Sequence, residues 1–523
     1  MKYLVYFKSL SKMKNLVSTF LCILVIALTL CSCKDKELVV TPDPVVPKAL
    51  FSTSPDSLKF TESAGSDTLK INMNGSNWTV LSNQTWCTLS FNSSSKASDK
   101  LIVSTSTNTV AGPRTATLTF IMDQKTIVYF KVIQTAKTGL YPSYKDSIAA
   151  DITGMNSDAK TLASKMSVGW NVGNSLEAAG GETAWGNPQI TQLLIDSIKA
   201  AGINAIRIPC NWNSYVEDAS TSKISATWFA RVKEVVDYCF KNNMYVILNI
   251  HWDGGWLDAT SAKQVAVNAK QKALWEQIAK YFRGYDEHLL FAGSNEPSST
   301  SGVSNENYAI QLSYNQTFVD AVRSTGGKNT YRNLIVQAFE TNIDKAVSNL
   351  VVSKDKVTNR LFVEVHYYDP WDYCGLETDA TWASAKYYWG APYAQYGLVN
   401  GQIDNMMGRV SNWGQEDYVR AQFQKMKTNF VDKGYPVILG EFGAMRRSSL
   451  TGSALTNHLA SRAYYMQYIA QYAKQYGMVP FIWDNGATGD KGFGIFNRSN
   501  GSVFDRQTLN AYITGAVNGK YPF

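Results

Sequence analysis

The stretch YVILNI, residues 245–250, is an apolar run rich in aromatic and β-branched side chains. It is followed by an amphipathic segment, residues 266–285, and then by a second apolar run, LLFAG, at residues 289–293. Two apolar runs joined by a helix of this length predict two parallel strands with a crossover helix. Such strands are apolar on both faces because helices cover the sheet.

The same alternation continues outward from this unit, from about Tyr144 to the end of the chain. The predicted strands are Ser167–Val172, Ala205–Pro209, Tyr245–Ile250, Leu289–Gly293, Leu334–Ala338, Leu361–Val365, Val437–Leu439 and Val479–Trp483. The helix-like segments are Gln189–Ala201, Ala226–Asn242, Ala266–Tyr285, Asn307–Ser324, Tyr418–Lys433 and Leu455–Tyr476. Eight strands alternating with helical sequence predict an α/β domain, a (β/α)8 TIM barrel, over residues 143–523. An open doubly wound sheet is the alternative, but GWNVGN at residues 169–174 lacks the G-x-G-x-x-G spacing that such a sheet would favour.

Length and composition limit the class of protein. The chain has 523 residues, too many for one ordinary domain, with 45% hydrophobic and 18% charged residues. These values exclude wholesale disorder and a polytopic membrane protein. The formal charge of +8 falls to +4 without Lys2, Lys8, Lys12 and Lys14, so we expect no nucleic-acid partner.

The N-terminal segment, residues 1–32, has the parts of a secretory signal peptide, with lysines before an apolar stretch. The stretch Leu16–Leu30 has roughly fifteen residues, fewer than the about 20 that span a bilayer. It ends in LCSC, which resembles a bacterial lipoprotein signal and implies that Cys33 is acylated. An uncleaved signal anchor is the alternative. The proline-containing residues 33–48 are predicted to be an extended tether.

Four cysteines remain beyond Cys33, namely Cys87, Cys210, Cys239 and Cys374. They are widely spaced and form no CxxC motif, so we expect no disulfide framework, although one bridge stays open. The chain has only four histidines and no HExxH motif. We therefore expect no metal and no cofactor.

Residues 49–137 predict a separate β domain. The predicted strands are Ser57–Thr61, Thr68–Met73, Trp78–Leu81, Thr88–Phe91, Lys100–Thr105, Thr115–Ile121 and Ile127–Gln134, a spacing typical of a β-sandwich. The motifs NWTV (77–80), QTW (84–86), RTATL (114–118) and VIQ (132–134) resemble an immunoglobulin-like BACON domain. The resemblance implies either glycan binding or a spacer. We expect a spacer, with Trp78 and Trp86 in its core.

Polar side chains follow most of the barrel strands, and in a barrel the carboxyl ends of the strands meet at one face. In chain order these side chains are Asn174, Arg207, His251, Asn295, Glu296, His366, Tyr368, Glu441, Trp483 and Asp484. Two glutamates on opposite sides of such a ring are what glycoside hydrolysis needs. One carboxylic acid protonates the leaving oxygen, and one carboxylate attacks the anomeric carbon.

The motifs NEP at residues 295–297 and GEFG at residues 440–443 resemble the acid/base and nucleophile motifs of glycoside hydrolase family 5. The resemblance spans residues 143–523 and implies that Glu296 is the acid/base and Glu441 the nucleophile of a retaining enzyme. It also implies active-site support from Arg207, His251, Asn295, His366, Tyr368 and Trp483. The nearby carboxylates Glu340, Glu364 and Asp484 do not match the motifs, and we interpret them as structural.

The residue types suggest roles at this face. Arg207 and Tyr368 should keep Glu441 ionised by stabilising its charge. Glu296 must begin protonated and later act as a base, so its pKa should rise and fall with the charge on its neighbour. Retention of configuration requires the two carboxyl groups to lie about 5 to 5.5 Å apart.

An endo-acting polysaccharide hydrolase should expose aromatic side chains along a cleft, because aromatic rings stack on sugar faces. The predicted substrate-binding residues are Trp371, Trp252 and Trp389, together with Asn174. The segments GWNVGNSL (169–176), ETAWGNP (182–188) and HWDGGW (251–256) resemble the endo-β-1,4-glucanases and xyloglucanases of family 5. One departure is Trp252, where many relatives have a second histidine.

The lipoprotein signal, the sandwich and the hydrolase together resemble the surface endo-xyloglucanases of Bacteroidetes glycan-utilisation systems. This resemblance implies an outer-membrane lipoprotein, exposed at the cell surface, that hydrolyses a plant β-glucan, most simply xyloglucan, by double displacement. The alternatives are an endoglucanase on unbranched or mixed-linkage β-glucan, a mannanase, and a non-catalytic glycan-binding surface protein.

Overall fold

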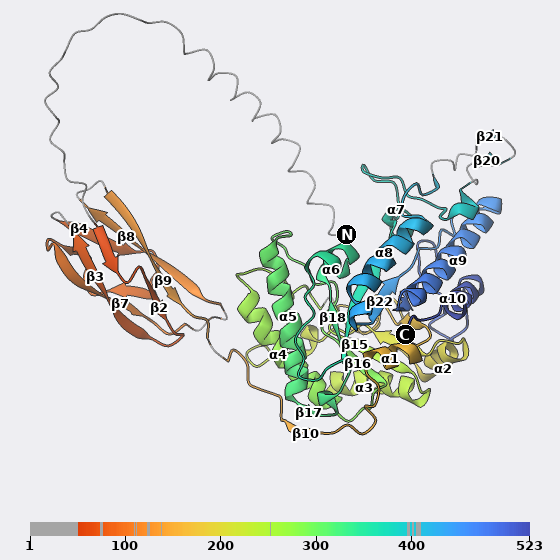
Figure 1. The fold of residues 1–523 in the computed structure, drawn as a ribbon, viewed down its shortest axis with the longest axis horizontal. Coiled ribbons are helices and arrows are strands. Elements are labelled where there is room, and N and C mark those ends of the chain that lie inside the picture. Colours follow the sequence, from red (N-terminus) through yellow and green to blue (C-terminus); the bar gives the residue numbers. More distant parts are fainter. Residues whose placement is uncertain are drawn as a thin grey trace, which may run out of the picture.

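The computed structural model describes residues 51–73, 77–108, 110, 112–122, 126–137, 139–251, 253–394, 398–399, 402–403 and 409–523. The predicted signal peptide, Cys33 and the tether lie outside the described residues, as does Trp252. None of the described helices has both the length and the apolar character that a membrane span requires. Figure 1 shows two domains joined by a single connecting segment.

The larger domain is built on a closed barrel of parallel strands. In order around the barrel they are β11 (Gly169–Asn171), β12 (Ala205–Ile208), β15 (Tyr245–Asn249), β16 (Leu289–Ala292), β18 (Leu334–Gln337), β19 (Leu361–Tyr367), β22 (Val437–Phe442) and β23 (Met478–Ile482). Strand β23 pairs in parallel with β11 and closes the ring. The predicted (β/α)8 barrel is therefore confirmed.

Helices surround this barrel (Figure 1): α2 (Gln192–Ala200), α3 (Ala226–Lys241), α4 (Gln264–Tyr281), α5 (Asn305–Ser324), α6 (Ile343–Asn349), α8 (Glu416–Asn429), α9 (Gly452–Gln475) and α10 (Arg506–Asn518). The short helix α1 (Ala159–Lys165) packs its apolar side against the barrel interior near the amino ends of the strands. Helix α7 (Trp371–Cys374) follows β19, and minor strand pairs are β10 (Ile148–Ala150) with β17 (Gly326–Gly327), β13 (Val216–Asp218) with β14 (Lys223–Ile224), and β20 (Leu398–Val399) with β21 (Gln402–Ile403). Helices α1, α6, α7 and α10 were not predicted.

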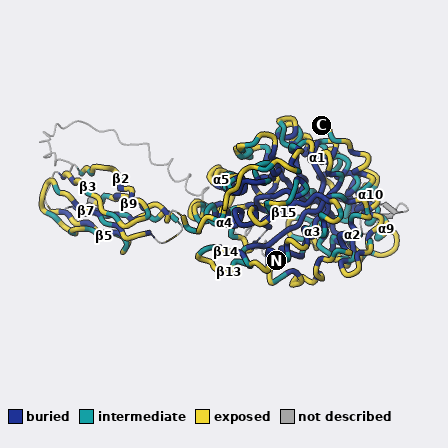
Figure 2. The backbone as a smooth tube through the Cα atoms, turned by 90° about the horizontal axis from the view of Figure 1, so that it is seen from below, coloured by how far each residue is buried: buried dark blue, intermediate teal, exposed yellow. Residues whose placement is uncertain are grey.

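The strands are buried on both faces, as their continuous apolar runs predict (Figure 2). Alternate side chains point to opposite faces of a strand. In β15, Val246 and Leu248 join the core under the helices, whereas Tyr245 and Ile247 join the core inside the barrel. The inner row of β15 continues with Asn249, so the barrel interior is apolar at the amino ends of the strands and becomes polar toward their carboxyl ends.

The smaller domain is a sandwich of two sheets, which confirms the predicted β-sandwich. One sheet has the order β1 (Phe51–Ser54), β3 (Gly65–Met73), β7 (Ser98–Thr105), β5 (Cys87–Leu89), and the other β2 (Ser57–Phe60), β9 (Thr126–Gln134), β8 (Arg114–Met122), β4 (Trp78–Ser82), β6 (Ser93–Ser94). Trp78 is buried in its core, as expected. Trp86 packs at the edge of this core, with the Arg114 guanidinium 4.2 Å from its ring centre.

The four described cysteines are buried free thiols.

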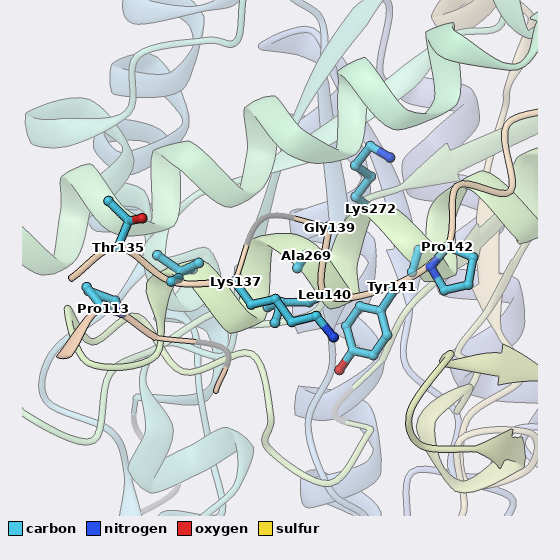
Figure 3. A pocket seen from close by; sticks show the side chains of 12 residues that line it. Pro113, Thr135, Lys137, Gly139, Leu140, Tyr141, Pro142, Ala269 and Lys272 are labelled. Atoms are coloured by element: carbon cyan, nitrogen blue, oxygen red, sulfur yellow. The ribbon is translucent and has the colours of Figure 1, made fainter. Parts of the chain in front are cut away.

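The connecting segment runs along helix α4 of the barrel. The Tyr144 backbone N–H donates to Glu276 at 2.6 Å, and the Asp146 carboxylate pairs with Lys280 at 2.9 Å. A cavity of about 510 Å³ lies next to this segment. It is lined by residues at the end of the sandwich, by the connecting segment and by the first turns of α4. Figure 3 shows Lys137 and Tyr141 on the connecting segment and Lys272 on the helix at this cavity.

Candidate active site

A polar layer closes the barrel interior at the carboxyl ends of the strands, and Arg207 on β12 lies at its centre. The Arg207 side chain is fully buried. Its Nη1 donates to Glu441 Oε1 at 2.9 Å and to Asn171 Oδ1 at 3.0 Å, and its Nη2 donates to Asn295 Oδ1 at 2.6 Å. One guanidinium therefore ties together the ends of β11, β16 and β22.

Glu441, near the end of β22, is held by donors on both of its oxygens. Arg207 binds Oε1, and the Tyr368 hydroxyl donates to Oε2 at 3.0 Å. Its side chain is only 7% exposed. The preceding Gly440 is required by the packing, since a Cβ there would lie 2.1 Å from a carboxylate oxygen of Glu364. The position of Glu441 is thus fixed by its neighbours.

Glu296 lies just after β16, and its backbone has a φ of 43°, a left-handed conformation that is unusual for a residue with a side chain. Its carboxylate contacts the His366 imidazole, with Oε1 2.9 Å from Nδ1. The side chain remains 47% exposed. Glu296 is therefore the carboxylate that faces solvent, in contrast to Glu441.

Glu364 lies one pleat below His366 on β19 and points to the same face of the strand. Its Oε1 lies 2.9 Å from Arg207 Nε and 3.3 Å from His366 Nε2. Gln337 on β18 donates to its other oxygen at 2.6 Å. Glu364 is completely buried, so it is a fixed negative charge that orients both the guanidinium and the imidazole.

The two glutamates are close together. An oxygen of Glu296, a ring nitrogen of His366 and an oxygen of Glu441 all lie within 4.8 Å of one another. His366 Nδ1 is 3.7 Å from Glu441 Oε2, so the imidazole lies between the two carboxylates.

The charges in this cluster depend on one another. Burial alone would lower the pKa of His366, but Glu441, Glu296 and Glu364 raise it to about 9, so His366 is a cation at neutral pH. Burial raises the pKa of Glu441 above its ordinary value despite the opposing charges of His366 and Arg207, which differs from the expectation that Arg207 and Tyr368 would keep this carboxyl ionised. A single proton between the two catalytic candidates would leave the cluster neutral, with Arg207 and His366 as cations and Glu364 and one catalytic carboxylate as anions.

The pKa of Glu296 differs from the expectation of a raised value. Burial alone would raise it, but the hydrogen bond and the positive charge of His366 lower it below its ordinary value. Sequence reasoning assigned His366 to the site without recognising that it would be a cation next to Glu296. For His251 the direction is opposite, because burial and the nearby Arg207 charge hold its pKa well below the ordinary value and keep the ring neutral.

A cleft cavity of about 630 Å³ opens above this layer. It is lined by His251, Asn295, Glu296, Tyr368, Trp371, Glu441, Trp483 and Phe493. The His251 and Trp483 rings are nearly parallel, with centres 6.1 Å apart, and form one wall. Trp371 is 46% exposed, so its ring is available to a ligand. The structure thus brings the eight predicted catalytic and supporting residues to one face, with Trp371 at the cavity.

Two predicted substrate-binding residues are not at the cavity. The prediction for Trp389 is wrong, because the ring is completely buried against Tyr464 and Tyr465 of α9. Asn174 does not line the cavity, and its backbone is bound by the side chains of Glu177 and Asn187. Its φ of 57° is a left-handed turn conformation that asparagine tolerates.

Sequence reasoning missed Phe493 and underestimated Glu364. Phe493 comes from the loop after β23, where no strand pattern marks a position, and its ring meets Tyr368 edge-on at 6.4 Å. Glu364 had a usable signal, since it is a charged residue inside an apolar run and two positions before His366. That spacing places both side chains inside the barrel.

Comparison with known proteins agrees with this geometry. The sequence profile described as Cellulase (glycosyl hydrolase family 5) matches residues 170–489, which is more than half of the chain and contains both glutamates. The chain belongs to glycoside hydrolase family 5. The profile of the BACON domain matches residues 76–135 of the sandwich. This family 5 chain is therefore a glycoside hydrolase with an N-terminal BACON domain.

Relatives narrow the class of family 5 enzyme to endoglucanases. The chain is 37% identical over 455 residues, covering 84% of this chain and 86% of the relative, to the xyloglucan-specific endo-beta-1,4-glucanase BoGH5A of Bacteroides ovatus. The solved Bacteroides ovatus GH5 xyloglucanase, in complex with a XXXG heptasaccharide, has a TM-score of 0.66 and 35% identity, covering 90% of this chain and all of that chain. A GH5-4 broad specificity endoglucanase from Bacteroides salanitronis has a TM-score of 0.61 and 35% identity, and the match covers 69% of this chain and 96% of that chain.

Proposed function

We propose that this family 5 enzyme is a retaining endo-β-1,4-glucanase that acts on xyloglucan by double displacement. The observation that carries the mechanism is the approach of Glu296 and Glu441, since one oxygen of each carboxyl group lies within 4.8 Å of one oxygen of the other. Retaining glycosidases place their carboxyl groups about 5 to 5.5 Å apart, whereas inverting enzymes need about 6.5 to 9.5 Å to admit a water molecule. The short separation supports direct attack by one of the two.

Glu441 is the nucleophile in this proposal. Arg207 and Tyr368 both donate to it, and these donors stabilise the anion that must attack the anomeric carbon. In the first step a bond forms between Glu441 and that carbon, and the glycosidic bond breaks. The proton of Glu296 moves to the departing oxygen.

Glu296 is the acid/base, and its exposure explains how it acquires the proton. A sugar that covers the cleft displaces solvent from a side chain that is 47% exposed, and this desolvation raises the pKa of the Glu296 carboxyl. When Glu441 becomes an ester, its negative charge is lost and the pKa of Glu296 falls again. Glu296 then takes a proton from the water that attacks the anomeric carbon, and the bond to Glu441 breaks.

The supporting residues fit the binding of a sugar ring in the cleft. Asn295 accepts from Arg207 through Oδ1, so its amide N–H groups are left for a sugar hydroxyl, which we assign to the 2-hydroxyl. Trp483 forms an apolar floor, and a Cβ on Gly173 would come within 2.6 Å of its ring, so this glycine makes room for the tryptophan. Trp371 offers an exposed aromatic face to a further sugar.

The choice of xyloglucan rests on the relatives, two of which are described as a xyloglucan-specific glucanase and a xyloglucanase. The test is the product profile of residues 35–523 on xyloglucan, unbranched β-glucan and mannan. We expect branched oligosaccharides on a four-glucose backbone from xyloglucan, and no products from Glu441→Ala. Equal rates on unbranched glucan would favour a broad specificity enzyme like that of Bacteroides salanitronis. Binding without any products would contradict catalysis.

We also propose that Cys33 is acylated and anchors the enzyme at the outer membrane, facing the medium. The support is the sequence LCSC after an apolar stretch preceded by lysines. Cells expressing the full chain should incorporate an alkynyl fatty acid into the enzyme, and Cys33→Ala should abolish this incorporation. External protease should remove the enzyme from intact cells. Protection from protease would contradict surface exposure, and label retained by Cys33→Ala would contradict acylation at this residue.

A further inference from the structure

A second, smaller cavity reaches the acid/base from the side. It has a volume of about 150 Å³ and lies between the loop after β18 and the end of β19, next to helix α8. Glu296 and Tyr368 border both this side cavity and the cleft cavity, and His366 also lines the side cavity. A molecule in the side cavity can therefore reach Glu296 without crossing the sugar-binding cleft.

Two residues that line the side cavity each have a buried polar atom with no hydrogen-bond partner among the described residues. These atoms are the hydroxyl of Tyr367, which is 2% exposed, and Oε1 of Gln422, which is 3% exposed. The Gln422 amide nitrogen is already engaged, since it donates to Tyr418 at 2.7 Å and to Asp344 at 3.3 Å. Buried polar groups are almost always hydrogen-bonded to protein or to ordered water. A donor and an acceptor in one cavity therefore point to bound water.

Other occupants fit the side cavity less well. A sugar ring would need an aromatic face to stack on, but the Tyr367 ring is buried against Phe423 of α8, with centres 5.2 Å apart. A cation would need several oxygens at one point. Among the described residues, the carboxylates of Glu340, Asp344 and Asp369 do not form such a group.

We propose that the side cavity holds ordered water that supplies the hydrolytic water molecule to Glu296. This inference rests on the double displacement proposed above. In the second step the water oxygen forms a bond to the anomeric carbon, the bond to Glu441 breaks, and the water proton moves to Glu296. Tyr367 and Gln422 are positioning residues for this water, because each lines the side cavity and has a buried polar atom that is left to bind water.

A lateral water supply has a consequence for product formation. Water then reaches the glycosyl-enzyme while a sugar still occupies the leaving-group side of the cleft. A sugar acceptor must enter through the cleft, so water and acceptor arrive by different routes. Changing the side cavity should alter hydrolysis and leave transfer to a sugar acceptor unchanged.

The test uses the double variant Tyr367→Phe/Gln422→Met in the enzyme from residue 35 onward. A 2-deoxy-2-fluoro-β-cellobiosyl donor with a dinitrophenolate leaving group traps the glycosyl-enzyme, and mass spectrometry measures the adduct. Reactivation is then followed in buffer alone and with added cellobiose. Gln424→Met is the matched control for the glutamine substitution, since it replaces glutamine by methionine on the exposed side of α8. Thermal unfolding checks that each variant is folded.

We expect the double variant to reactivate about tenfold more slowly in buffer and at the parental rate with saturating cellobiose. An unchanged rate in buffer would overturn the proposal, and so would equal slowing of both reactions, which would indicate a general effect on Glu296. A higher KM for oligosaccharides with normal reactivation would make the cavity a sugar subsite instead. If the parent enzyme forms no adduct, the proposed double displacement is wrong. A wrong water-supply proposal would instead give an adduct that reactivates normally in the double variant.

Discussion

The ends of β16 and β22 present the same residue type in opposite surroundings. Glu441 at β22 is 7% exposed and is held by a guanidinium and a hydroxyl. Glu296 after β16 is 47% exposed and contacts the imidazole of His366, which also contacts Glu364 and Glu441. A carboxylate with fixed donors keeps its position, whereas the protonation of one that exchanges solvent for substrate can change when substrate binds. The proposed roles of nucleophile and acid/base therefore rest on the difference in surroundings rather than in residue type.

The largest expected effect is the loss of the nucleophile. Glu441→Ala should lower kcat on xyloglucan by about five orders of magnitude, because no other described carboxylate occupies its position. Added azide should restore turnover of an activated aryl glycoside and give the α-glycosyl azide. The exposed Glu306→Ala on α5 serves as the control and should keep full activity. A β-configured azide product would instead make Glu441 the acid/base and Glu296 the nucleophile.

Removal of the acid/base should have a smaller effect that depends on the leaving group. Glu296→Ala should lower the rate on xyloglucan by about 10² to 10⁴, the usual contribution of general acid catalysis. A dinitrophenolate leaves without protonation, so the first step on a dinitrophenyl glycoside should keep its rate. A burst of dinitrophenolate followed by slow turnover would establish this. An equally large loss in the burst on the activated substrate would argue against an acid role.

The shared imidazole predicts a pH dependence of stability. Since the pKa of His366 is raised to about 9 in the folded state from an ordinary 6.5, its protonation stabilises the fold fully below about pH 6.5. This stabilisation is lost as the pH rises through about 9. Glu364→Gln removes one cause of the shift, so the variant should lose less stability over this pH range.

The measurement is the free energy of unfolding in urea at intervals from pH 6 to pH 10. Glu182→Gln is the control, because Glu182 is a buried carboxylate paired with Arg231 at 2.7 Å rather than with a histidine. Its destabilisation should be constant across this pH range. Parallel curves for Glu364→Gln and the parent enzyme would show that His366 does not titrate there.

The smallest expected effect on activity is that of Trp371→Ala, and it differs in kind from the effect of Trp389→Ala. Trp371→Ala should raise KM for xyloglucan about tenfold, equivalent to about 1.4 kcal/mol, with little change in unfolding temperature, because the ring is half exposed at the cleft. Trp389→Ala should instead destabilise the fold by about 3 to 5 kcal/mol, since it leaves a cavity under α9. Thermal unfolding and initial rates on the two variants distinguish these outcomes. Equal KM for Trp371→Ala and the parent would remove Trp371 from the binding site.

The sequence predicted the barrel well because its strands are apolar on both faces. The apolar run at residues 245–250 and the observed β15 differ by one residue, Ile250, which lies just beyond the end of the strand. The catalytic candidates were accessible for a similar reason: Glu296 and Glu441 follow apolar runs at positions that a barrel brings together.

The errors concern packing that no local pattern contains. The exposure of Trp389 depends on Tyr464 and Tyr465 of α9, far along the chain. The importance of Glu364 depends on Arg207 from another strand. Helix α6 escaped prediction because it has a single turn of buried residues, Ile343 and Ala346, too few for a periodic signal.

The connecting segment along α4 determines how mechanical load passes between the domains. A pull on the sandwich is transmitted first to the contacts of Tyr144 with Glu276 and of Asp146 with Lys280. These contacts lie on an outer helix, and the chain passes them before it reaches β10 at the end of the barrel opposite the glutamates. The first contacts that bear tension along the chain therefore lie on the outside of the barrel rather than on the ring of strands that holds the catalytic geometry.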